Sequence, residues 1–157
     1  MDFDKVLQLF RELHRHEVEY VLVGGVALNL LGLVRPTDDV DLFIRPTEEN
    51  VARLKAALRA VWDDPAIEEI AAAELAGDMP VVRYGPPDDE LMTVDVIARL
   101  GTAFRYEDIE FMVQPHDGIP VRVATPRMLY RLKRDTIRST DRGDAERLLE
   151  KFKFEGE

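Results

Sequence analysis

The sequence has no cysteine and no long hydrophobic run in its 157 residues. The lack of cysteine excludes disulfides and thiolate metal sites and is typical of a reducing compartment. No segment approaches the roughly 20 apolar residues that a membrane-spanning helix needs. The first ten residues, MDFDKVLQLF, carry two acids and no long apolar run, unlike a signal peptide. We therefore expect a cytoplasmic protein with no membrane segment.

Positive charge is also scarce, because 21 lysines and arginines face 31 acids, for a net charge of −10. Such a surface, taken as a whole, repels nucleic acid. The basic residues gather between Arg127 and Arg142, a stretch with only two acids. This segment predicts either a local anion site or an ordinary solvated helix face. The three histidines show no ligand spacing tied to the aspartates.

Helical and strand patterns alternate along the chain, which predicts a mixed α/β fold in one domain over residues 1–157. We expect four or five strands in one small sheet flanked by helices, with C-terminal helices over about 126–152 packed on the core. The expected strands are 20–23, 39–44, 79–84, 92–98, 111–114 and 119–123. The first expected helix begins at residue 3. The other expected helices cover about 26–33, 48–61, 66–76, 126–138 and 145–152, and the STDRGD segment is expected to interrupt the chain before the last of them.

Two aspartates interrupt the apolar strand DVDLFI at Asp39 and Asp41. Side chains alternate along a strand, so both carboxylates lie on one face while the apolar residues between them face the core. Like charges this close repel unless a cation lies between them, and carboxylate oxygens suit magnesium or manganese. The alternative is that both lie on a solvent-facing edge strand.

Two further features favour the metal site over the solvent-facing edge strand. Gly24-Gly25 lies between a strand and a helix, where glycine permits a sharp turn and close approach to a ligand, although a tight turn alone would also need it. Asp95 is a third aspartate in an apolar strand, TVDVI. If that strand neighbours DVDLFI, three carboxylates meet and can hold the two divalent ions used in nucleotidyl transfer. The alternative for Asp95 is a strand-end residue that caps a loop.

The order VLVGG, VALNLLGLVRPT, DDVDLFI and TVDVI resembles the minimal nucleotidyltransferases of the DNA polymerase β superfamily. Within it, GGVALNLLGLVRPTDDVDLFI and the later run DGIPVRVATPRMLYRLKRDTIRSTDRGDAERLL look most like the AbiEii-type branch, which includes toxins of type IV toxin–antitoxin systems. The resemblance extends over about residues 20–149. It implies the nucleotidyltransferase fold.

The resemblance also implies roles for individual residues. Gly24 and Gly25 would cradle the phosphates of the nucleotide. Asp39 and Asp41 would hold the metal ions. Asp95 would bind the ion nearest the acceptor and help to deprotonate its hydroxyl.

Positive and hydroxyl side chains complete the implied site. Lys133 would contact a phosphate, or else be one charge among many on the basic face. Arg35 and Thr37 would contact the triphosphate or brace the loop before the metal strand. Asp38 is expected in a turn, pointing away from its neighbours. Arg138, Asp141 and Asp144 match the terminal pattern of the branch and are expected in structural salt bridges.

The implied activity is transfer of a nucleoside monophosphate from a nucleoside triphosphate, such as ATP, to an acceptor hydroxyl, with Mg²⁺ or Mn²⁺ as cofactor. Three alternatives stay open at this point: a toxin–antitoxin component that modifies RNA, such as tRNA, or protein; an antibiotic-type enzyme with a small-molecule acceptor; and a catalytically idle binding module. The chain is about the minimal catalytic core, so the short helices, a homodimer partner or a cognate toxin–antitoxin partner would complete the substrate surface.

Overall fold

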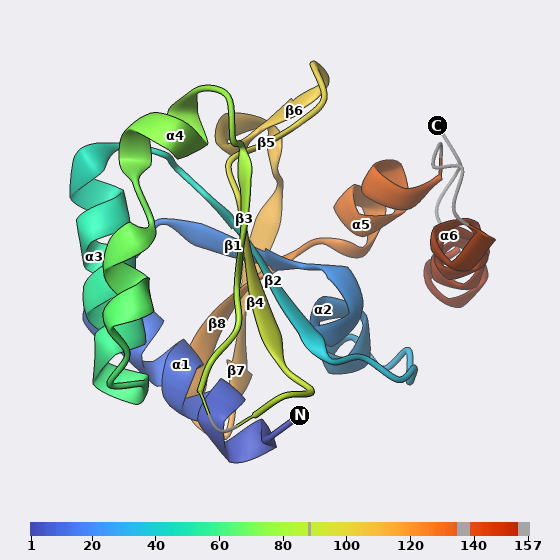
Figure 1. Ribbon diagram of the computed structural model, residues 1–157. Coiled ribbons are helices and arrows are strands. Elements are labelled where there is room, and N and C mark those ends of the chain that lie inside the picture. Colours follow the sequence, from blue (N-terminus) through green and yellow to red (C-terminus); the bar gives the residue numbers. More distant parts are fainter. Residues whose placement is uncertain (88, 135–138, 154–157) are drawn as a thin grey trace.

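The computed structural model describes residues 1–87, 89–134 and 139–153 and shows a mixed sheet between two groups of helices (Figure 1). Six strands form the sheet in the order β3-β4-β2-β1-β8-β7. Their bounds are Tyr20–Val23 for β1, Asp39–Ile44 for β2, Val81–Tyr84 for β3, Thr93–Ile97 for β4, Phe111–His116 for β7 and Ile119–Ala124 for β8.

Helices α1 and α3 cover one face of the sheet, and α2, α5 and α6 lie on the other side (Figure 1). Their bounds are Phe3–Arg15 for α1, Gly24–Leu30 for α2, Glu48–Val61 for α3, Pro126–Lys133 for α5 and Ser139–Phe152 for α6. Short helical segments follow α3, namely η1 (Pro65–Glu69) and α4 (Ala72–Ala76), and η2 covers Tyr106–Asp108. Among the described residues, no helix is long and apolar enough to cross a membrane.

Polar caps set where the longer helices begin. The side chain of Asp2 accepts hydrogen bonds from the backbone at the start of α1, and Thr47 does the same for α3. Thr125 caps α5, with proline at the first helical position, so the helix begins at residue 126 as predicted. On the inner face of α1, Val6 and Phe10 are fully buried in the main core.

Strand β2 lies at the centre of the sheet and pairs differently on its two sides. It runs antiparallel to β1, with Asp41 opposite Val23, and parallel to β4, with Asp41 opposite Asp95. Because β1 ends at Val23, the chain leaves the sheet beside Asp41 and enters α2 at once. This topology brings the glycine turn and two of the aspartates together.

The α/β fold class is confirmed, and the details differ from the sequence prediction in the extent of the sheet. All six predicted strands join one sheet, whereas we expected four or five in it. A small hairpin of β5 (Arg99–Leu100) and β6 (Phe104–Arg105) was not predicted, because two-residue strands carry no readable alternation.

Two helix boundaries also differ. Helix α2 begins at Gly24 instead of after the glycines, because Gly24, at φ +73°, turns the chain directly from β1 into the helix. The break predicted at residues 139–144 was wrong, since α6 begins at Ser139 and continues through Gly143. Burial of Asp144 and Leu148 against the rest of the protein outweighs the low helix propensity of glycine. The predicted end of α5 near residue 138 lies outside the described residues.

Candidate active site

Three aspartates lie on the face of the sheet that carries α2, α5 and α6. Asp39 and Asp41 alternate with buried residues of β2, and the register of β2 with β4 places Asp95 directly beside Asp41. The same register places Thr93 beside Asp39, and the Thr93 hydroxyl donates a hydrogen bond of 2.5 Å to Asp39 Oδ1. Residues far apart in the sequence therefore form one acidic cluster.

Asp41 is partly buried and lies next to both other carboxylates of this cluster. Burial, and then the charges of Asp95 and Asp39, raise the pKa of Asp41 from 3.8 to about 7. A hydrogen bond to Asp95 adds to the rise, whereas the positive charge of Lys133 opposes it. The protein thus holds a carboxyl group where its ionised form is disfavoured, and an added cation would relieve that strain.

Gly24 and Gly25 make room for this side of the site. A β-carbon on Gly24 would lie 1.9 Å from Asp41 Oδ2, and one on Gly25 would lie 2.7 Å from the Thr37 hydroxyl. Glycine is therefore required at position 24 both by its φ of +73° and by the carboxylate beside it. The sequence prediction explained the two glycines by phosphate binding, and the structure adds a steric reason.

The loop before β2 is held from both ends. The backbone amide of Arg35 donates to Asn29 Oδ1 in α2 at 2.9 Å, and its guanidinium donates to Asp144 Oδ2 in α6. The hydroxyl of Thr37 lies 3.4 Å from the amide of Asp39, at the start of the strand. These contacts support the bracing role that the sequence left open for both residues.

Lys133 is buried rather than part of the exposed basic surface. Its Nζ donates to Asp144 Oδ2 at 3.2 Å, and both residues are less than one tenth exposed. Asp144 thus joins Lys133 and Arg35, which confirms the salt-bridged role predicted for it. Arg138 lies outside the described residues, as does the side chain of Asp141. Asp38 is exposed, with its carbonyl bonded to the amide of Thr93.

Two residues of the cluster escaped the sequence analysis. Arg83 of β3 donates to both oxygens of Asp95, from Nε at 3.0 Å and from Nη2 at 3.2 Å. This hydrogen bond, and the negative charges of Asp95 and Asp39, raise the pKa of Arg83. Thr93 could have been found from its spacing, because it lies two residues before Asp95 in one strand and so faces the same side. Nothing in the sequence shows that β3 pairs with β4 in this register.

The donor set suits Mg²⁺ or Mn²⁺, since these ions prefer carboxylate oxygens and the positive charge of Lys133 does not offset the raised pKa of Asp41. Within the described residues, however, no three acidic, histidine or cysteine side chains are placed to hold an ion together as they stand. Asp39 is turned toward Thr93, and Asp95 is bound by Arg83. The chemistry of the cluster fits a divalent ion, and its side chains would have to adjust to ligate one.

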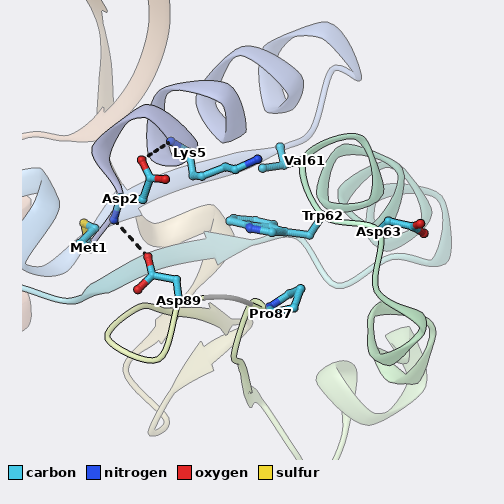
Figure 2. Close-up of a pocket in the computed structure, with 8 residues that line it drawn as sticks. All are labelled: Met1, Asp2, Lys5, Val61, Trp62, Asp63, Pro87 and Asp89. Carbon is cyan, nitrogen blue, oxygen red and sulfur yellow. Dashed lines mark hydrogen bonds between the residues drawn. The ribbon is translucent and has the colours of Figure 1, made fainter.

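A pocket of about 550 Å³ opens on the opposite side of the sheet, between the start of α1 and the end of α3 (Figure 2). Trp62, Pro87, Asp2 and Asp89 are among the residues that line it. Figure 2 shows that these two acids are engaged with backbone amides, Asp2 with that of Lys5 and Asp89 with that of Asp2. Because none of Asp39, Asp41 and Asp95 lines this pocket, it is separate from the aspartate cluster.

One known protein family matches most of the chain. The family described as nucleotidyl transferase AbiEii toxin, type IV toxin–antitoxin system, matches residues 8–146. The chain belongs to this AbiEii family. Membership assigns it to the nucleotidyltransferases, a class of transferases, and to the proteins of toxin–antitoxin systems. A search among curated protein sequences gave no match.

Solved structures of nucleotidyltransferases share the fold of this AbiEii-family chain. The solution structure of the antibiotic-resistance factor ANT(2'')-Ia matches with a TM-score of 0.58 at 13% identity, over 97% of this chain and 86% of that one. A crystal structure of ANT(2'')-Ia with adenylyl-2''-tobramycin gives a TM-score of 0.53 at 13% identity, over 94% and 87%. A Thermotoga maritima protein assigned to the nucleotidyltransferases gives 0.54 at 15% identity, over 96% and 92%.

Proposed function

We propose that the protein transfers a nucleoside monophosphate from a nucleoside triphosphate to an acceptor hydroxyl, with release of pyrophosphate and with Mg²⁺ or Mn²⁺ as cofactor. The observation that carries this proposal is the register of β2 with β4, which sets Asp41 beside Asp95 with Asp39 on the same face. When bound, the divalent ions would neutralise charge on the phosphates and orient the attacking oxygen.

The aspartates divide the chemical work in this proposal. Asp39 and Asp41 would hold the ions, which in turn would position the triphosphate. Asp95 lies nearest the edge strand β3 and accepts the proton of the acceptor hydroxyl as its oxygen attacks the α-phosphorus. The bond from the α-phosphorus to the pyrophosphate oxygen breaks as the new bond forms.

The phosphate contacts come from the opposite side of the cluster. Gly24 and Gly25 would allow the backbone to approach the phosphates closely. The side chain of Thr37 lies next to Gly25. Lys133 and Arg35 supply positive charge, held in place by Asp144. A triphosphate bound here would lie between the start of α2 and Lys133 at the end of α5, with its α-phosphorus toward Asp95.

For the acceptor we propose RNA, such as tRNA, or protein, in keeping with the toxin–antitoxin family. A cognate antitoxin would then control the chain in the cytoplasm, where nucleoside triphosphates are available, and a homodimer would enlarge the acceptor surface. The competing acceptor is a small molecule of the aminoglycoside type, because the ANT(2'')-Ia structure contains adenylyl-2''-tobramycin and shares this fold.

The test is incubation of the purified protein and Mg²⁺ with nucleoside triphosphates radiolabelled at the α-phosphate, each with tRNA, with cell protein or with an aminoglycoside. We expect label on RNA or protein from one preferred nucleotide and none from the Asp41→Ala variant. Asp38→Ala is the matched control, because it removes an exposed acid next to the cluster. Label on the aminoglycoside alone would assign the small-molecule activity. No transfer with any acceptor, by folded protein, would favour the idle binding module.

A further inference from the structure

Arg83 forms two hydrogen bonds to Asp95, the proposed general base, whereas an ordinary surface ion pair often has only one. Strand β3 is at the edge of the sheet, and its register with β4 sets Arg83 opposite Asp95. Two guanidinium nitrogens, Nε and Nη2, reach the two oxygens of Asp95 at 3.0 and 3.2 Å. This two-pronged contact satisfies both oxygens along the directions in which a cation would bind.

A metal ion and Arg83 therefore compete for the same carboxylate. A divalent ion on Asp95 needs at least one of the oxygens that Arg83 now occupies, and it would repel the guanidinium at short range. Asp39 offers an ion one oxygen more freely, because Thr93 donates only to its Oδ1. The ion that relies on Asp95 is thus the one that Arg83 opposes.

Arg83 is also placed so that it can leave. Its side chain is 66% exposed, whereas that of Asp95 is 12% exposed. Among the described residues, the Arg83 guanidinium donates to no acceptor other than Asp95. Rotation of this one side chain into solvent frees Asp95 without moving the strand.

We propose that Arg83 is a positioning residue that occupies Asp95 in the metal-free protein and yields it when a divalent ion binds. The inference rests on the proposed function, since it concerns the ion that serves the same reaction. Arg83 keeps Asp95 oriented and neutralised while the site is empty of nucleotide. As a consequence, the nucleotide-free protein binds metal ions more weakly, and the full set of ions assembles only together with the triphosphate.

The first test measures Mn²⁺ affinity without nucleotide, by calorimetry or by the electron paramagnetic resonance signal of free Mn²⁺. We expect Arg83→Ala to bind Mn²⁺ about three- to tenfold more tightly than the wild type, in line with the strength of a half-exposed ion pair. Arg83→Lys keeps the positive charge but cannot form the two-nitrogen contact with Asp95. Its Mn²⁺ affinity should lie between those of the wild type and Arg83→Ala. The control Arg53→Ala removes an exposed arginine that pairs with Glu49 on α3, and should leave the affinity unchanged.

The second test observes Arg83 directly, through the Nε–H resonance of its guanidinium in ¹⁵N NMR spectra of the wild type. In EDTA this proton should be slow to exchange, and Mg²⁺ should shift the resonance and speed its exchange, while that of Arg53 stays unchanged. A resonance that Mg²⁺ binding leaves in place would overturn the proposal, as would equal or weaker Mn²⁺ binding by a folded Arg83→Ala protein.

The two proposals fail in different ways. Wild-type protein that binds Mn²⁺ and transfers nucleotide, with no effect of Arg83→Ala on affinity, removes only the role of Arg83. Absence of Mn²⁺ binding in both the wild type and Arg83→Ala removes the metal-dependent function and the competition together.

Discussion

Asp41 lies where its negative charge is disfavoured, between two other carboxylates and largely out of solvent. A carboxyl group whose pKa is raised in the folded state binds its proton more tightly there than in the unfolded chain. Its contribution to stability is therefore fully present at low pH and is lost as the pH rises through the folded pKa. For Asp41 the window extends from near 3.8 to about 7.

We predict that Asp41→Asn stabilises the metal-free protein at pH 8. The amide mimics the protonated carboxyl, so the variant escapes the loss that the wild type suffers between pH 4 and 7. The gain in the free energy of unfolding should be on the order of 2–4 kcal/mol at pH 8 and close to zero near pH 4. Urea unfolding in EDTA across this pH range measures it. Parallel pH curves for the two proteins would contradict the raised pKa of Asp41.

The sequence alone identified the three aspartates and the glycine pair as candidate site residues. It did not identify the residues that contact them. An aspartate inside an apolar strand is visible in the sequence because it breaks an expected pattern. Arg83 breaks no pattern, since a polar residue on a half-exposed edge strand is ordinary. Its contact with Asp95 depends on strand order and register, which are long-range properties that local spacing does not determine.

Helices α5 and α6 meet the loop before β2 through one buried carboxylate. Asp144 of α6 accepts hydrogen bonds from Lys133 of α5 and from Arg35 of the loop. Arg147 of α6 adds a bond to the carbonyl of Val34 at 3.1 Å. The C-terminal helices thus hold the loop that precedes the aspartate strand.

We predict that Asp144→Ala destabilises the protein by about 3 kcal/mol, because removal of one partner from a buried ion pair leaves the others uncompensated. The measurement is the free energy of unfolding in urea at neutral pH. Glu146→Ala, at an exposed position of the same helix, should change it by less than about 0.5 kcal/mol. If the two substitutions had equal effects, Asp144 would not hold the helices and the loop together.

At the scale of the elements, the sequence predicted the starts of α3 and α5 correctly and the starts of α2 and α6 incorrectly. Helices α3 and α5 begin at residues 48 and 126 as predicted, because their caps, Thr47 and Thr125, depend on neighbouring residues alone. Residues 139–144 looked like a break because glycine and aspartate disfavour helix. The burial of Asp144 and Leu148, which sequence spacing did not show, makes this segment helical.

Over the whole molecule, the net charge of −10 sets how a polyanionic acceptor would approach. Two of the positive charges at the site, Lys133 and Arg35, are already shared with Asp144. Few phosphates can then be neutralised, although RNA is a proposed acceptor. Selection of RNA by this chain would depend on shape and on the active site more than on general attraction to phosphate.

We predict a shallow salt dependence for tRNA binding, with the slope of log K against log salt smaller in magnitude than about 3. Each phosphate neutralised contributes roughly 0.7–0.9 to that slope, so the limit corresponds to only a few contacts. Fluorescence anisotropy with labelled tRNA between low and moderate salt measures it. A slope of about 6 or steeper would reveal an extended phosphate-binding surface instead.

The parallel pairing of β2 with β4 also has a consequence for protein synthesis. Asp39 and its partner Thr93 are 54 residues apart, and α3, η1, α4 and β3 lie between them in the chain. A chain still on the ribosome that has not yet released β4 has two of the aspartates but not the third, and it lacks the lysine and the buried aspartate that follow. The three aspartates of the cluster therefore come together only after β4 has been synthesised and has paired with β2.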